Sequence, residues 1–166
     1  LCDRRQRQMC IRDKHTTDMK RKDIYTIIAA WLTAVLSASC EIETSDNGDL
    51  DGFWHLERVD TIRTGGRLDL KDEYVFWAVQ KDLLNACDRH GDRGDFLFRF
   101  EHKGKTLRLY DPHVNDRMNG DPAVDDAGML RPFGVNALDE TFGVERLTGS
   151  KMVLSTEELR LSFTKL

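Results

Sequence analysis

Apolar residues recur at every second position in short stretches of the chain from residue 52 onward. The clearest stretch begins with Phe96, Phe98 and Phe100, which occupy alternate positions. A two-residue turn at Lys103-Gly104 follows, and the alternation resumes at Leu107. This pattern predicts a β-hairpin with one face buried. Three phenylalanines on one face more often form a core than a binding site.

Further strands are expected on both sides of this hairpin. Gly52-Phe53-Trp54 opens a stretch that runs to about Arg63, just before the turn residues Thr64-Gly65-Gly66. The stretch from Glu73 to Asp88 begins with aromatic and β-branched residues, which favour one long bent strand, with a helix in its second half as the alternative. Three more strands are expected at residues 142 to 144, 152 to 154 and 159 to 163.

A long polar stretch from Asp111 to Phe133 separates the hairpin from the last three strands and holds all three prolines of the chain. A loop of this length is unusual inside a compact domain unless it is functional or caps one end of the fold. If the strands simply alternate in direction from Trp54, the loop lies at the Trp54 end and plugs a floor. A helix or a reversal within residues 73 to 88 would instead place it at the opposite end, as a lid over the mouth.

Taken in order, these segments amount to seven or eight antiparallel strands with few helices. Such a series predicts an all-β fold, either an up-and-down barrel or a curled sandwich. The predicted strands place the folded domain at residues 52 to 166.

The first 39 residues have a different character. Residues 1 to 18 carry scattered charges without periodicity and are expected to be either a mis-annotated extension of the gene start or a disordered tail. From Met19 a short basic segment precedes the apolar run from Ile24 to Leu36. This order predicts a secretory signal peptide at residues 19 to 39, because a transmembrane helix needs about 20 apolar residues and this run is shorter.

The signal segment ends at Cys40. The sequence Leu36-Ser37-Ala38-Ser39-Cys40 resembles a lipobox, where lipoprotein signal peptidase cuts before a lipid-bearing cysteine. The usual leucine stands four positions before Cys40 instead of three, and Ser37-Ala38-Ser39 also fits ordinary signal peptidase, which would release an unlipidated protein. We expect lipid attachment at Cys40, anchoring the protein to the outer membrane, with either a periplasmic or a surface-exposed domain in the cell envelope.

Residues 40 to 166 hold 17 Lys and Arg against 25 Asp and Glu, so their net charge is −8. This balance argues against nucleic acid as a partner, because phosphate binding needs a basic patch. Acidic residues are concentrated at residues 40 to 51, which we expect to be a solvated tether. The tether resembles the acidic segment that follows the lipidated cysteine in some surface-exported lipoproteins of Gram-negative anaerobes.

The tripeptide Gly52-Phe53-Trp54 resembles the glycine-x-tryptophan that opens the first strand of lipocalin and lipocalin-like domains, where the tryptophan closes the barrel floor. The phrases from Phe142 to Leu154 and from Leu159 to Lys165 resemble the closing strands of small lipocalin-like lipoproteins. Together they cover most of residues 50 to 166. The resemblance implies an antiparallel up-and-down lipocalin-like β-barrel, open at one end, that can hold a pocket.

No catalytic constellation is visible, and we expect neither an enzyme nor a cofactor. Cys87-x-x-His90 is half of a metal-site pattern without a second pair, so Cys87 is expected to be a small buried hydrophobe. The oxygen-rich loop of residues 111 to 126 does not have the ligand spacing of a Ca²⁺ loop. Phosphate-loop and nucleophile-elbow motifs are absent from the sequence.

Two classes of function remain. In the first, the barrel of a monomeric envelope lipoprotein binds a small apolar or amphipathic ligand, which the family resemblance favours. The residues expected to line this pocket are Trp54, Trp77, Phe96, Phe98 and Phe100. In the second, side chains fill the barrel and its outside binds a protein or glycan. A connected, solvent-reachable cavity inside the barrel would distinguish the two.

Overall fold

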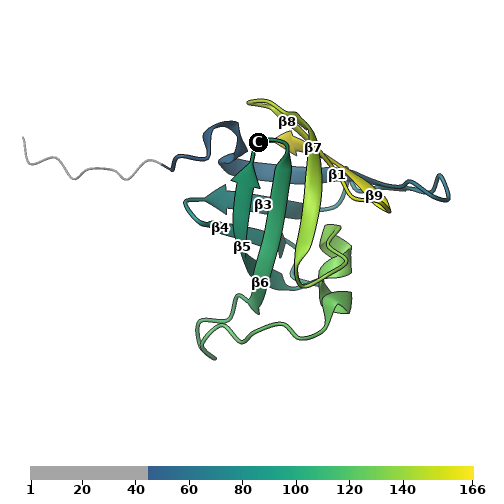
Figure 1. Ribbon diagram of the computed structural model, residues 1–166. Helices are drawn as coiled ribbons and strands as arrows, with labels where there is room; N and C mark the ends of the chain where they lie inside the picture. The colour runs from purple at the N-terminus through teal and green to yellow at the C-terminus, as the bar shows by residue number, and fades with distance from the viewer. Residues whose placement is uncertain (1–44) are drawn as a thin grey trace, which may run out of the picture. The chain divides into compact units, whose positions relative to one another are not determined.

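The structure is a computed structural model that describes residues 45–166 (Figure 1). The predicted signal peptide, the residues before it and Cys40 lie outside the described residues. The strands are β1 (Gly52–Thr61), β2 (Arg67–Asp69), β3 (Val75–Gln80), β4 (Leu83–Asp88), β5 (Asp95–Lys103), β6 (Thr106–Val114), β7 (Glu140–Leu147), β8 (Lys151–Ser155) and β9 (Leu159–Lys165). Two 3₁₀ helices accompany them, η1 (Gly48–Leu50) and η2 (Ala127–Phe133).

The strands form one closed antiparallel barrel. From β3 to β9 each strand pairs with the next along the chain, and β1 closes the ring by pairing with both β3 and β9. The short strand β2 stands outside this ring of eight and pairs with the second half of β1, beyond the point where β3 leaves it. The all-β, up-and-down barrel predicted from the sequence is therefore confirmed.

The segment from Glu73 to Asp88 is not the long bent strand that the sequence favoured. It is a hairpin of β3 and β4, in which Gln80 pairs with Leu83 across a two-residue turn. The turn residue Lys81 has a φ of 55°, a left-handed conformation usually taken by glycine or asparagine. The reversal was missed because the turn carries neither residue. It changes the direction of every later strand, so the loop after β6 lies at the end of the barrel opposite Trp54.

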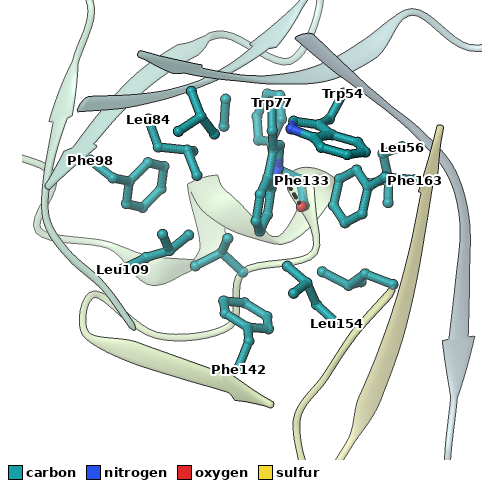
Figure 2. Close-up of a cluster of buried hydrophobic side chains, with 14 of the residues drawn as sticks. Trp54, Leu56, Trp77, Leu84, Phe98, Leu109, Phe133, Phe142, Leu154 and Phe163 are labelled. Carbon is teal, nitrogen blue, oxygen red and sulfur yellow. Dashed lines mark hydrogen bonds between the residues drawn. The ribbon is translucent and has the colours of Figure 1, made fainter. Parts of the chain in front are cut away.

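The hairpin predicted around Phe96 is confirmed as β5 and β6, with Lys103 paired to Thr106. Its turn is Gly104-Lys105, one residue later than expected, because Gly104 takes the positive φ of 58°. Inward side chains from all eight barrel strands build the core (Figure 2). Trp77 lies at the centre of this core. The centroid of its ring is 4.9 Å from that of Phe163 and 5.8 Å from that of Phe142.

The barrel end at the start of β1 is closed by the residues that precede it. Leu50 of η1 is 1% exposed, and the indole Nε1 of Trp54 donates to its carbonyl oxygen at 2.8 Å. Lys165 Nζ lies 4.9 Å from the centre of the Trp54 ring and donates to the Asp49 carbonyl. Within the described part of the predicted tether of residues 40 to 51, residues 48 to 50 form η1, and Leu50 is buried at this end of the barrel.

Candidate functional site

The interior of the barrel is the first place to look for a site, and its own side chains fill it. Trp54 and Trp77 are 0% exposed, Phe98 is 1% exposed and Phe96 is 2% exposed. A side chain at zero exposure has no space beside it for even a water molecule. Phe100 is partly buried against the same core, near the β5–β6 turn. The sequence predicts that these five residues line a pocket, whereas in the structure they pack in or against the core.

The end of the barrel opposite Trp54 is plugged by residues 127 to 135, here called the mouth plug. Leu130, Phe133 and Val135 of this segment are fully buried. The Phe133 ring meets Phe96 edge-on, with 5.5 Å between centroids. The indole Nε1 of Trp77 donates to the Phe133 carbonyl at 3.2 Å, the bond drawn in Figure 2. The loop is therefore at the mouth, and it enters the barrel.

Local sequence explains how the mouth plug forms. Asp126 caps η2 by accepting from the Gly128 N–H at 2.7 Å, and Gly134 ends the helix with a φ of 81°. A Cβ added to Gly134 would lie 2.7 Å from the Leu161 side chain, so any larger residue at this position would collide with the core. The carboxylate of Glu140 accepts from the backbone N–H groups that follow the plug, and burial raises its pKa.

A groove crosses the outside of the barrel over β3 to β6. It consists of two adjoining hollows of about 250 and 330 Å³ that share Leu83 and Leu97 in their walls. We call this the outer groove. Its full lining is Ala78, Gln80, Lys81, Asp82, Leu83, Asn85, Leu97, Phe98, Arg99, Asp111, His113, Arg117 and Asp121. The floor is apolar and the rim is polar, the composition typical of a binding surface.

An irregularity in the sheet shapes the outer groove. The pairing of β5 with β6 shifts between Leu97 and Arg99, where Asp111 adopts a φ of 54°. Such a bulge bends the strand and turns side chains in a new direction. As a result, Asp111 and His113 stand over Leu97 at one end of the groove, with Nε2 of His113 3.2 Å from Oδ1 of Asp111.

Charged side chains around the outer groove form ion pairs with one another. Arg99 forms an ion pair with Asp82, and Nε of Arg117 lies 3.5 Å from Oδ2 of Asp121. Nδ1 of His113 donates to the Asp121 carbonyl at 2.9 Å, since a carbonyl oxygen can only accept. The second carboxylate oxygen of Asp121 is buried and has no hydrogen-bond partner among the described residues. This arrangement suits recognition of a polar partner.

The metal and thiol candidates do not converge. Cys87 is buried on the outer side of β4, and burial followed by the nearby Asp95 carboxylate raises the pKa of its thiol. His90 packs edge-on against the Tyr74 ring at 4.6 Å. Across residues 45–166, His, Cys, Asp and Glu side chains do not gather in threes at distances that suit a metal ion.

Sequence reasoning missed the outer groove, although one signal was present. Leu97 occupies an outward position between the inward residues Phe96 and Phe98, where a polar side chain would be expected on a solvated face. Leu83 is also an outward residue, on the neighbouring strand β4, where it pairs with Arg99, two residues along β5 from Leu97.

Comparison with known proteins places the chain in a structural context. The family described as a lipocalin-like domain matches residues 32–166. The crystal structure of a lipocalin-like protein from Bacteroides uniformis ATCC 8492 is 25% identical, with a TM-score of 0.55 over 72% of this chain and 100% of that chain. An uncharacterized protein from Bacteroides eggerthii DSM 20697 is 23% identical, with a TM-score of 0.49 over 70% and 98% of the two chains. No curated protein matches the chain. Within the described part, no helix is long and apolar enough to span a membrane.

Proposed function

The chain belongs to the lipocalin-like domain family. From this membership and from the filled interior, we propose that it is a lipid-anchored envelope protein. Its barrel is a rigid scaffold that binds a protein or glycan partner on its outside. The observation that carries this proposal is the mouth plug. Phe133 occupies the barrel mouth and touches Phe96, where the interior of a lipocalin-like barrel would otherwise be open. A small apolar ligand therefore has no vacant place among these side chains.

The outer groove is the proposed contact surface. Its apolar floor at Leu83 and Leu97 is half-buried, and its rim carries the paired charges of Arg99 and Arg117. Interfaces between proteins have this anatomy, with an apolar centre that loses water on binding and a polar rim that sets the orientation. The rigid sheet beneath the groove lowers the entropy cost of binding because little has to be ordered.

The interior is tested with apolar probes. In this test the full chain is to be titrated with fatty acids and with 1-anilinonaphthalene-8-sulfonate, and thermal unfolding and tryptophan fluorescence are to be measured. A filled barrel predicts no rise in the unfolding temperature, because only a ligand that binds the native state stabilises it. A saturable rise together with a change in the buried tryptophan signal would overturn the proposal.

The outside is tested on arrays of glycans and peptides probed with the labelled full chain. Leu97→Arg places a long charged side chain on the groove floor and should abolish binding of whichever class is recognised. Val153→Arg is the matched control, since Val153 is also a half-buried outward residue, but on β8. Binding that survives Leu97→Arg, or that both variants lose equally, would contradict the assignment of the outer groove.

The lipid anchor is proposed from the sequence and has its own test. The full chain expressed in a Gram-negative host should incorporate labelled palmitate and partition into detergent, whereas Cys40→Ala should do neither. Equal labelling of both forms would exclude lipidation at Cys40. A chain that begins at Met19 should be exported as well as the longer one if residues 1 to 18 are dispensable.

A second candidate, binding of an apolar ligand inside the barrel, is favoured by one observation. The mouth plug belongs to η2 and not to the ladder of paired strands, so it can leave the barrel without breaking strand pairing. In that case a ligand would take the place of Phe133. Deleting residues 114 to 126, the part of the long loop that precedes the mouth plug, should then change the affinity for the ligand. An unchanged affinity would exclude a role of this loop as the lid.

A further inference from the structure

The second half of β1 and the strand β2 form an arm beside the barrel. β1 runs on after β3 has left it, and there β2 takes the place of β3 as its neighbour. In Figure 1 the chain between β1 and β2 extends away from the barrel as a long turn on the right of the view. All three residues of β2 are exposed, and Leu68 is 57% exposed. In the described part of the chain, β2 has no neighbour on its other side.

The hydrogen bonds of the arm show which backbone groups point away from β1. Leu70 N–H donates to Glu57 O at 2.8 Å, and Thr61 N–H donates to Gly66 O at 2.8 Å. Bonded pairs alternate in an antiparallel ladder, so the pair midway between these two, Val59 with Leu68, is also bonded. The N–H and C=O groups of the residues on either side of Leu68 therefore face the open edge.

We propose that this edge is a pairing surface for a second copy of the chain. In an antiparallel pairing of β2 with β2 about a two-fold axis at Leu68, Arg67 lies opposite Asp69 of the second copy, and Asp69 lies opposite Arg67. These are the residues whose backbone groups face the open edge, so each of the two pairs exchanges both of its hydrogen bonds. The contact is isologous, as the interface of a two-fold dimer must be.

The charges of β2 favour a second copy of the chain as the partner, paired in this register. The strand reads Arg67-Leu68-Asp69, so only the antiparallel self-pairing sets opposite charges against each other, whereas a parallel pairing sets arginine against arginine. The same alternation already exists inside the arm, where Arg58 pairs with Asp69 and Asp60 with Arg67. Nε of Arg67 lies 3.2 Å from Oδ1 of Asp60. The second copy extends this ladder of charges, and opposite charges on facing strands are favourable.

The side chain at the axis adds an apolar contact. Leu68 lies on the opposite face of the arm from the charges, beside Val59, which packs against the core. In the dimer the two Leu68 side chains meet each other in a non-bonded pair, where facing side chains are closest. Short, charged edges protect proteins from non-specific pairing, and this edge excludes strands that lack its charge pattern. The contact is small, so the dimer is expected to be reversible. It does not depend on the partner proposed for the outer groove.

Disulfide trapping tests the axis directly in the full chain. Facing residues of a non-bonded pair have Cα atoms about 4.5 Å apart, within the range that a disulfide can bridge. Under mild oxidation, Leu68→Cys should give at least about fivefold more covalent dimer than Ile62→Cys on a non-reducing gel. Ile62 is the matched control because it is 52% exposed in the same arm but away from the axis. The native cysteines contribute an equal background to both variants. Equal yields from the two variants would overturn the proposal.

Charge variants made in the Leu68→Cys background test the register. Arg67→Asp or Asp69→Arg alone should lower the yield of covalent dimer about tenfold, because two favourable charge pairs become two like-charge pairs. Mixing these two variants should restore the yield, since each then supplies the charge that the other lacks. If the single variants gave as much covalent dimer as the parent, or if the mixture showed no recovery, the register would be contradicted.

Discussion

Replacing Phe133 with alanine removes the largest side chain of the mouth plug from a position that is fully buried. The ring packs edge-on against Phe96, and Leu130 and Val135 are buried beside it. A Phe→Ala change in a core costs about 3–5 kcal/mol, and the cost is higher where the surroundings cannot collapse into the space. Here the wall is a closed ladder of paired strands, so we expect about 4–5 kcal/mol.

The assay is urea unfolding of the full chain, with Met129→Ala as the matched control. Met129 lies in the same 3₁₀ helix but is 44% exposed, so its loss should cost less than about 0.5 kcal/mol. A loss below about 1 kcal/mol for Phe133→Ala would mean that the plug does not pack into the barrel. Such a result would refute the filled interior.

The same variant gives a second, independent readout. Apolar cavities made by truncating buried side chains remain dry and bind small apolar molecules such as benzene. Benzene should therefore raise the unfolding temperature of Phe133→Ala and leave the unaltered protein unchanged, with a gain of about 2.7 kcal/mol at one hundred times the dissociation constant. Equal stabilisation of both proteins would mean that an open pocket already exists.

Four further substitutions and measurements follow from other parts of the barrel. Phe98→Ala should lower the free energy of unfolding by roughly 3–5 kcal/mol, and a loss below about 1 kcal/mol would mean that this face is open. Trp54→Phe removes the indole donor of the floor and leaves a buried carbonyl unpaired, so we expect a loss of about 1–3 kcal/mol in urea unfolding. Cys87 should resist iodoacetamide at neutral pH until the chain is unfolded, because burial raises the pKa of its thiol; peptide mass spectrometry after labelling distinguishes it from the other cysteines. The pKa of Glu140 is raised in the folded state, so its contribution to stability is present below the ordinary glutamate pKa and is lost as the pH rises through the raised value. The stability of the protein relative to Glu140→Gln should therefore increase as the pH falls from 7 towards 4, and a difference that does not vary with pH would contradict the raised pKa.

The strands were predictable where local pattern alone decides the structure. Phe96 and Phe98 alternate with outward neighbours, and a glycine lies in the turn that follows, so period and turn chemistry agree. The closing strands around Phe142 and Phe163 are also where the sequence placed them. In these segments burial on one face fixes the register.

The reversal at Lys81 was not predictable by the same means. Lysine disfavours a positive φ, and the turn forms because strand pairing on both sides compensates for the local strain. Missing this single turn left open which end of the barrel the long loop occupies. Topology depends on the count of reversals, so one hidden turn has consequences for every strand after it.

The mouth plug was hidden for a related reason. Leu130, Phe133 and Val135 are separated by an arginine, a proline and a glycine, and they show neither a helical nor a strand period. Their burial comes entirely from the cavity that the barrel offers them. Whether that cavity holds a ligand or its own loop is a tertiary outcome, and composition is the same in both cases.

The seam between β1 and β9 has a consequence for how the chain reaches its native state. Trp54 pairs with Lys165 and Thr61 with Leu159, so the first and last strands of the barrel lie side by side. Contacts so distant in sequence slow folding, because the loop between them must be closed first. During synthesis β1 keeps an unpaired edge until β9 has left the ribosome. This delay suits the export proposed for this chain, since the ring cannot close until its final strand is made.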